Sequence, residues 1–189
     1  MRNKIYIAGQ QGMVGSAIIK LLQKKKSNII YCKRRDLDLT NQAQVEKWFK
    51  KNKPDIVINA AGRVGGILDN SKFIDEYIYI NTMIGFNLLN CASKHGVKKF
   101  INLGSACIYP REAKQPIKER YLLSSKLEKS NEGYALAKIS TLKYCEYLKQ
   151  KYKKNFISLQ PANLYGEGDN FDLKSSHVIP ALIRKFHTA

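Results

Sequence analysis

The sequence has 189 residues, of which 44% are hydrophobic, and this predicts one domain, or one domain and a fragment of another, with a substantial core. Its formal net charge of +18 comes mostly from lysines scattered near expected helix ends, which favours an anionic ligand over a nucleic-acid partner. No apolar run approaches the roughly 18 residues that span a membrane, and no signal peptide is evident, so we expect a cytoplasmic protein without a membrane partner. The four cysteines lack C-x-x-C spacing, which suits a reducing compartment and predicts no metal site.

The first strand and the segment after it form a pattern typical of a nucleotide-binding α/β domain. Residues Lys4–Ala8 make a short apolar run that predicts a buried strand, and residues 16–25 have the apolar spacing of an amphipathic helix. Between them lies a glycine-rich loop made of Gly9, Gln10, Gln11, Gly12, Met13, Val14 and Gly15. Glycines in this context let the backbone approach a pyrophosphate at a helix N-terminus, so we expect dinucleotide binding, with an ordinary glycine turn as the alternative.

The second expected strand, at residues 28–32, is followed by a cluster of charged side chains. Lys33, Arg34 and Arg35 come first, and Asp36 comes after them. An acidic residue at this place binds the ribose hydroxyls of NAD, whereas an arginine suits the 2′-phosphate of NADP. We therefore predict NADP(H) as the cofactor and Arg35 as its phosphate contact, with a solvated charge cluster as the alternative.

Strands and helices alternate through the rest of the chain. The apolar patterns predict strand, helix, strand, helix and strand at residues 55–59, 71–94, 98–103, 132–151 and 156–160. This order predicts an α/β fold with a Rossmann-like, doubly wound parallel sheet and helices on both faces. Ligands bind such sheets at the carboxyl ends of the strands, which is where we expect Gly9, Ala60, Ser105 and Asn163. Separate regions of the chain are thus predicted to meet in one cleft.

Tyr134 and Lys138 are the most informative pair of residues in the sequence. They are four residues apart at the start of an expected helix, so they share one face of it. An ammonium beside a phenol favours the phenolate, which predicts that Tyr134 exchanges protons nearer neutral pH than its reference pKa of about 10. Both residue types are common in this chain, and a half-exposed helix face is the alternative. Ser105 follows the preceding strand and adds a hydroxyl to the expected site.

Ser105, Tyr134 and Lys138 together resemble the proton-transfer group of the short-chain dehydrogenase/reductase superfamily, and the G-x-x-G-x-x-G loop resembles that of its extended branch. Longer blocks at residues 12–17, 64–67, 107–110 and 176–182 resemble the GDP-L-fucose synthase family. The resemblance implies that residues 1–170 form the cofactor domain and that residues 171–189 begin a substrate domain, otherwise largely absent from this sequence. A fragment of a longer protein and a truncated gene product are the two explanations.

The resemblance implies a two-stage reaction on GDP-4-keto-6-deoxy-D-mannose. Cys107 and His177 would exchange protons at carbons 3 and 5 of the sugar, with the roles of acid and base unassigned. NADPH would then reduce carbon 4, while Tyr134 donates a proton and Ser105 binds the sugar oxygen. Lys138 would hold the nicotinamide ribose of the cofactor.

The same resemblance assigns further contacts and implies a homodimer packed through the two long helices. Lys185 is the implied contact to the GDP-sugar substrate. Beside the glycine loop and Arg35, the implied cofactor contacts are Leu103, Gly104, Lys138, Pro161, Asn163, Leu164 and His177. Two alternatives are compatible with the same motifs: another nucleotide-sugar epimerase or dehydratase of the superfamily, and a non-catalytic NADP-binding pseudoenzyme.

Overall fold

A computed structural model describes residues 3–173 and 175–188 of the chain. Five strands form one parallel sheet in the order β2-β1-β3-β4-β5. In chain order, the strands are β1 (Lys4–Ala8), β2 (Asn28–Ile30), β3 (Ile56–Asn59), β4 (Lys99–Leu103) and β5 (Asn155–Leu159). The direction of winding reverses between β1 and β3, and sheets of this kind bind their ligands beside such a reversal.

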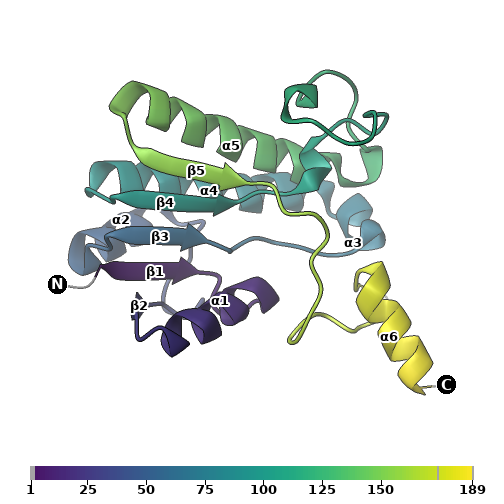
Figure 1. The fold of residues 1–189 in the computed structure, drawn as a ribbon, viewed down its shortest axis with the longest axis horizontal. Helices are drawn as coiled ribbons and strands as arrows, with labels where there is room; N and C mark the ends of the chain where they lie inside the picture. Colours follow the sequence, from purple (N-terminus) through teal and green to yellow (C-terminus); the bar gives the residue numbers. More distant parts are fainter. Residues whose placement is uncertain (1–2, 174, 189) are drawn as a thin grey trace.

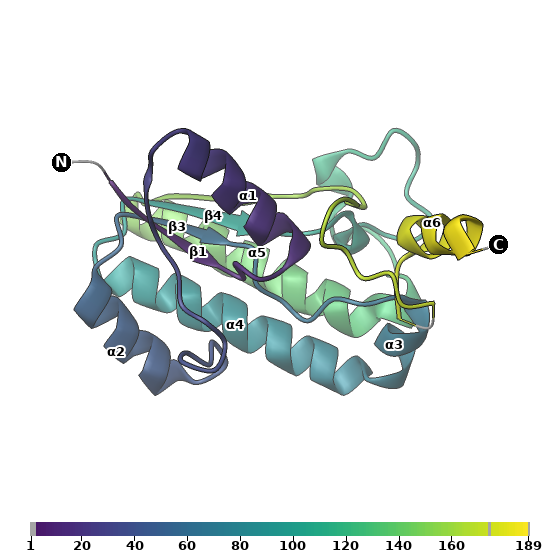
Figure 2. The same ribbon diagram turned by 90° about the horizontal axis from the view of Figure 1, so that it is seen from below.

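Helices cover both faces of the sheet. Helix α1 (Met13–Lys24) lies on one face, and α2 (Gln42–Asn52), α4 (Ile74–Lys94) and α5 (Glu132–Tyr152) lie on the other (Figures 1 and 2). Two further helices, α3 (Ile67–Lys72) and α6 (Val178–Thr188), lie beyond the carboxyl ends of the strands (Figure 1). Short 3-10 turns follow β4 along the chain at Ala106–Ile108, Glu119–Tyr121 and Lys129–Asn131. The predicted Rossmann-like, doubly wound sheet with helices on both faces is confirmed.

The main core fills the space between the sheet and the helices α2, α4 and α5. Each of four neighbouring strands contributes one side chain to a row across the sheet, and the row consists of Tyr6, Val57, Phe100 and Phe156. These four side chains are at most 1% exposed, and Phe49 of α2 and Leu88 of α4 pack in the same cluster. Full burial of a large apolar side chain contributes about 1.5–3 kcal/mol, so this row fixes the relative positions of the strands.

Three predicted bounds differ from the structure. The helix expected at residues 16–25 begins at Met13, because Gly12 already takes the extended backbone conformation of an N-cap. The second strand ends at Ile30 rather than at residue 32. The helix expected at residues 71–94 is interrupted at Phe73, whose backbone angles (φ −120°, ψ 39°) separate α3 from α4. The other predicted strands and the helix expected at residues 132–151 agree to within one residue.

Several lysines lie where the sequence predicts them, at the C-terminal ends of helices. Lys24 is in the last turn of α1, Lys50 and Lys51 are in the last turn of α2, and Lys153 follows α5. Cations at these ends complement the negative end of the helix dipole. Within residues 3–173 and 175–188, no helix combines the length and the apolar composition that a membrane span requires.

Candidate functional site

The loop after β1 leaves no room for a side chain at two of its three glycines. Gly9 has a φ of +83°, and a Cβ there would lie 2.6 Å from the carbonyl group of Ala60. A Cβ on Gly15 would lie 2.1 Å from the carbonyl oxygen of Gly9. At Gly12, by contrast, the nearest atom to a Cβ would be the Gly9 oxygen at 3.5 Å, an ordinary contact. Gly9 and Gly15 therefore serve packing, and Gly12 presents open backbone at the N-terminus of α1, where a pyrophosphate fits.

The other residues of the loop are divided between packing and exposure. Gln10 Nε2 donates a hydrogen bond to the carbonyl oxygen of Cys32 at 2.7 Å, which ties the loop to the segment after β2. Gln11 is exposed, and Met13 and Val14 form the first turn of α1. The first-turn backbone N–H groups of a helix are the donors that bind phosphate oxygens.

Arg35 lies in the turn after β2, on the segment that Gln10 anchors. Its side chain is 76% exposed, and its Nε lies 3.6 Å from a carboxylate oxygen of Asp36. An exposed ion pair of this length holds the side chain only weakly. The guanidinium is therefore accessible to a phosphate group.

Ser105 and Tyr134 meet at the carboxyl end of β4. The Ser105 side chain faces the phenol of Tyr134 and lowers its pKa, and the Ser105 Oγ accepts from the backbone N–H of Cys107 at 3.2 Å. The Tyr134 ring packs edge-on against Tyr77, with 6.3 Å between the ring centroids. Burial raises the pKa of Tyr134 to about 12, the nearby Cys107 adds to the rise, and the Ser105 hydroxyl partly offsets it. The phenol therefore keeps its proton at neutral pH and is able to donate it.

Lys138 lies one helical turn after Tyr134 on α5, and its side chain is buried. Its Nζ donates a hydrogen bond to the carbonyl oxygen of Leu103 at 2.9 Å and lies 5.5 Å from the centroid of the Tyr134 ring. Burial lowers the pKa of Lys138 to about 8. The prediction that this lysine brings the pKa of Tyr134 toward neutrality is wrong for this structure, because burial of the phenol raises its pKa and Lys138 does not offset the rise.

The segments after β4 and β5 run side by side at the edge of the site. Gly104 N–H donates to the last carbonyl of β5 at 2.7 Å, and Ala106 N–H donates to the Pro161 carbonyl at 3.0 Å. Asn163 and Leu164 are exposed just beyond this point. The segments predicted to contact the cofactor thus lie at the same edge of the sheet as the Ser105–Tyr134 pair.

His177 and Lys185 belong to the segment around α6. His177 is exposed and precedes α6, where its carbonyl accepts from Ala181 N–H at 3.1 Å, and Lys185 is exposed in the last turn of α6. The Ser175 carbonyl accepts from Gly66 N–H at 3.0 Å, which holds the start of this segment against the loop before α3. In the part of the chain that the structure describes, no hydrogen bond or ion pair joins His177 or Lys185 to Ser105, Cys107, Tyr134 or Lys138.

Two polar residues at the site were not singled out from the sequence. The Asn81 side chain, in the middle of α4, accepts from Arg63 N–H at 3.0 Å and donates to the Arg63 carbonyl at 3.1 Å, which fixes the loop after β3. Gln160, just after β5, accepts a hydrogen bond from the backbone of Ser105 at 2.9 Å. Asn81 could have been found as an amide on the buried face of a helix, because a buried polar side chain requires a hydrogen-bond partner.

The fold and the site together define a dinucleotide-binding α/β domain in which a serine, a tyrosine and a lysine lie at the carboxyl end of β4. Across residues 3–173 and 175–188, no cluster of three or more His, Cys, Asp or Glu side chains is arranged to hold a metal ion. Residues 5–189 match the NAD dependent epimerase/dehydratase family, and the chain belongs to this family.

Curated relatives agree with the resemblance seen in the motifs. The chain is 50% identical to a GDP-L-fucose synthase of Sinorhizobium fredii, over 98% of this chain and 59% of that protein. It is 43% identical to the GDP-L-fucose synthase of Escherichia coli, over 100% of this chain and 59% of that protein. The similarity to GDP-L-fucose synthases is therefore confirmed, and the chain spans about 59% of the length of these relatives.

Solved structures extend the comparison to the cofactor. A GDP-mannoheptose C4 reductase from Campylobacter jejuni with NADP bound is 41% identical, with a TM-score of 0.93 over 99% of this chain and 56% of that one. A GDP-L-fucose synthetase from Naegleria fowleri bound to NADP is 30% identical, with a TM-score of 0.89 over 99% of this chain and 58% of that one.

Proposed function

We propose that this chain is the cofactor-binding and catalytic part of an NADPH-dependent epimerase/reductase that converts GDP-4-keto-6-deoxy-D-mannose into GDP-L-fucose. The observation that carries the proposal is the grouping of Ser105, Cys107 and Tyr134 at the end of β4 and the start of α5. The names of the Sinorhizobium and Escherichia relatives support the choice of substrate.

The residues around the site fit NADPH, which supplies the hydride that reduces carbon 4. The open backbone at Gly12 receives the pyrophosphate, and the exposed guanidinium of Arg35 receives the 2′-phosphate. Lys138 holds the nicotinamide ribose, and its ammonium is charged below its pKa of about 8. The NADP-bound structures of the Campylobacter and Naegleria relatives support this choice of cofactor.

Tyr134 is the proton donor of the reduction. Its phenol is protonated at neutral pH, because burial raises its pKa to about 12, and it donates to the sugar oxygen on carbon 4 as that oxygen becomes an alkoxide. The Ser105 hydroxyl binds the same oxygen and keeps it beside the phenol.

Cys107 and His177 form the acid–base pair of the epimerisation. One of them removes a proton next to the carbon 4 carbonyl, and the other returns a proton on the opposite face of carbon 3 or carbon 5. Negative charge that builds on the carbonyl oxygen is stabilised by Ser105 and Tyr134, so one set of donors serves both stages. The backbone contact between Cys107 and Ser105 supports the place of the thiol in this site.

The proposal includes a homodimer in the cytoplasm. Large apolar side chains are exposed on the outer faces of both long helices, namely Ile78, Tyr79 and Phe86 on α4 and Leu136 and Tyr147 on α5. A second copy packed on these faces would bury them. The four cysteines are all free thiols, which suits a reducing compartment.

Cofactor binding and turnover are tested separately. The 189-residue chain is titrated with NADPH, and binding is followed by nicotinamide fluorescence. Turnover is measured with the chain extended by the C-terminal part of the Sinorhizobium relative, as loss of NADPH absorbance in the presence of GDP-4-keto-6-deoxy-D-mannose. We expect Tyr134→Phe to lower turnover by about 100-fold or more. The control Tyr152→Phe, at an exposed tyrosine in the last turn of the same helix, keeps wild-type turnover.

Two results would overturn the proposal. NADPH binding by a folded wild-type fusion without turnover of the GDP-sugar would support a non-catalytic NADP-binding protein. Turnover of a GDP-keto-heptose in place of the deoxy sugar would support a reductase like the Campylobacter relative.

A further inference from the structure

A row of polar side chains crosses the carboxyl ends of β3, β4 and β5. Asn59, Asn102 and Ser158 are neighbours in register on the three strands. Asn59 Nδ2 donates to Asn102 Oδ1 at 3.0 Å, and Asn102 Nδ2 donates to Ser158 Oγ at 3.0 Å. Both asparagines are at most 3% exposed, and water cannot replace hydrogen bonds in such a place without opening the sheet.

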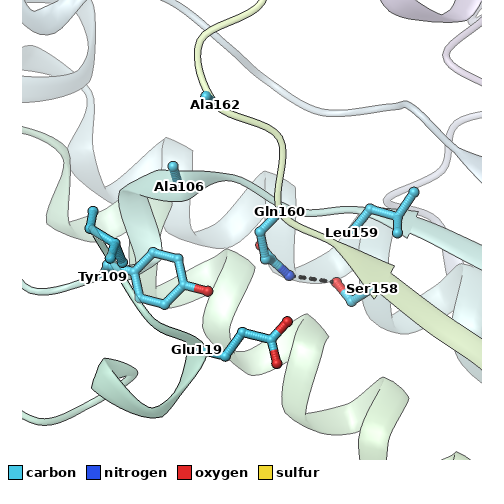
Figure 3. A pocket seen from close by; sticks show the side chains of 8 residues that line it. Ala106, Tyr109, Glu119, Ser158, Leu159, Gln160 and Ala162 are labelled. Carbon is cyan, nitrogen blue, oxygen red and sulfur yellow. Dashed lines mark hydrogen bonds between the residues drawn. The ribbon is translucent and has the colours of Figure 1, made fainter. Parts of the chain in front are cut away.

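Gln160 connects this polar row to Ser105. Its Nε2 donates to Ser158 Oγ at 3.1 Å, the bond drawn as a dashed line in Figure 3, and its Oε1 accepts from the backbone N–H of Ser105 at 2.9 Å. Both ends of the amide are therefore bonded, so its orientation is fixed. Gly104 allows this approach, because a Cβ there would lie 2.1 Å from Gln160 Oε1.

The backbone N–H of Ser105 donates to a different kind of acceptor from the N–H groups on either side of it. Gly104 N–H and Ala106 N–H donate to backbone carbonyls of the β5 segment, at 2.7 and 3.0 Å, whereas Ser105 N–H donates to a side chain. Gln160 also lines a hollow of about 370 Å³ beside Ala106 and Ser158 (Figure 3). Removal of its amide would leave Ser105 N–H without its acceptor and next to this hollow, while the flanking bonds persist.

We propose that Gln160 is a positioning residue for Ser105, because its amide, anchored on Ser158 and the Asn102–Asn59 pair, holds the Ser105 backbone so that the hydroxyl lies against Tyr134. The catalytic meaning of this contact rests on the proposed function, in which Ser105 and Tyr134 bind the same sugar oxygen. Gln160 touches neither substrate nor cofactor in this account. It acts through Ser105.

The first test is amide hydrogen exchange of the 189-residue chain, followed by NMR. Gln160→Met keeps the length of the side chain and removes both hydrogen bonds, whereas Gln160→Glu keeps an oxygen that accepts from Ser105 N–H. We expect exchange at Ser105 to become at least about tenfold faster in Gln160→Met and to stay near the wild-type rate in Gln160→Glu. Gln150→Met, the same change at an exposed position of α5, is the matched control and leaves this rate unchanged.

The pattern of exchange separates positioning from general loosening. Gly104 and Ala106 should keep their protection in Gln160→Met, because their acceptors are backbone carbonyls. Unchanged exchange at Ser105 in Gln160→Met would overturn the proposal. Equal loss of protection at Gly104, Ser105 and Ala106 would also overturn it, since that result describes a frayed strand end.

The second readout is the ¹³Cζ chemical shift of Tyr134, which reports how the Ser105 hydroxyl acts on the phenol. We expect the shift to change in Gln160→Met, to return to the wild-type value in Gln160→Glu, and to stay constant at the neighbouring Tyr77. A constant Tyr134 shift in all variants would show that Gln160 does not act on the Ser105–Tyr134 contact. Neither measurement needs turnover, so failure here is distinct from failure of the proposed reaction.

Discussion

The charge of Lys138 gives a quantitative prediction about stability. The side chain is 8% exposed, and burial lowers the pKa of its ammonium from 10.5 to about 8. Between these two pH values the unfolded chain holds a proton that the folded chain has lost, so the free energy of unfolding rises with pH across this window. At about 1.4 kcal/mol per pKa unit, the whole rise is about 3 kcal/mol. Below about pH 8 the folded chain carries the buried ammonium, so the free energy of unfolding is lower by this full amount.

Lys138→Met tests this reasoning, because methionine has a similar length and no charge. The free energy of unfolding by denaturant is measured for the wild type and the variant at about pH 7 and about pH 10. We expect the advantage of the variant over the wild type to be about 2.5 kcal/mol smaller at the higher pH, because pH 10 lies just below the unfolded pKa of 10.5. Losses that do not depend on pH, such as packing, cancel in this comparison.

The control is Lys149→Met, the same change at an exposed position of the same helix. Its pH dependence should follow that of the wild type. If the curves of Lys138→Met and the wild type run parallel from pH 7 to pH 10, the ammonium is not desolvated, and the buried position of Lys138 behind Tyr134 is wrong.

Three further predictions concern the cofactor loop, the core and cofactor choice. Gly12→Ala should change the free energy of unfolding by less than about 0.5 kcal/mol while weakening NADPH binding at least tenfold, whereas Gly15→Ala should destabilise by about 1–3 kcal/mol in denaturant unfolding. Phe100→Ala should lower the free energy of unfolding by about 3–5 kcal/mol. The control is Phe186→Ala, at a side chain that is 81% exposed, and it should cost less than about 0.5 kcal/mol. Equal effects of the two substitutions would contradict the burial of Phe100 in the core. Arg35→Ala should weaken NADPH binding about tenfold and leave NADH binding unchanged in parallel titrations, and equal losses would exclude a 2′-phosphate contact.

Much of the fold follows from local patterns in the sequence. Short apolar runs alternating with amphipathic segments predicted the parallel sheet, since each pattern needs only its own neighbours along the chain. The same topology predicted that Ser105 and the start of the helix at Tyr134 meet, because the ends of parallel strands lie at one edge of the sheet. The break at Phe73 was missed, because the apolar spacing continues across it without a change.

The parts of the site that were missed depend on tertiary structure. The pKa of Tyr134 was predicted from its distance along the helix to Lys138, but burial by other elements dominates it. The bond between Gln160 and Ser105 depends on the register of β4 and β5 and on the space above Gly104, which no local pattern encodes. The roles of Cys107 and His177, the bounds of the two predicted domains and the implied cofactor contacts stay predictions.

The central claim is that one site carries out both epimerisation and reduction. The most direct test is the reaction of the extended chain with GDP-4-keto-6-deoxy-D-mannose and NADPH in D₂O, with the product analysed by NMR. We expect deuterium from solvent at carbons 3 and 5 and hydrogen from NADPH at carbon 4. Cys107→Ser should lose the deuterium and keep the reduction. A wild-type product reduced at carbon 4 without deuterium at carbons 3 and 5 would contradict the account.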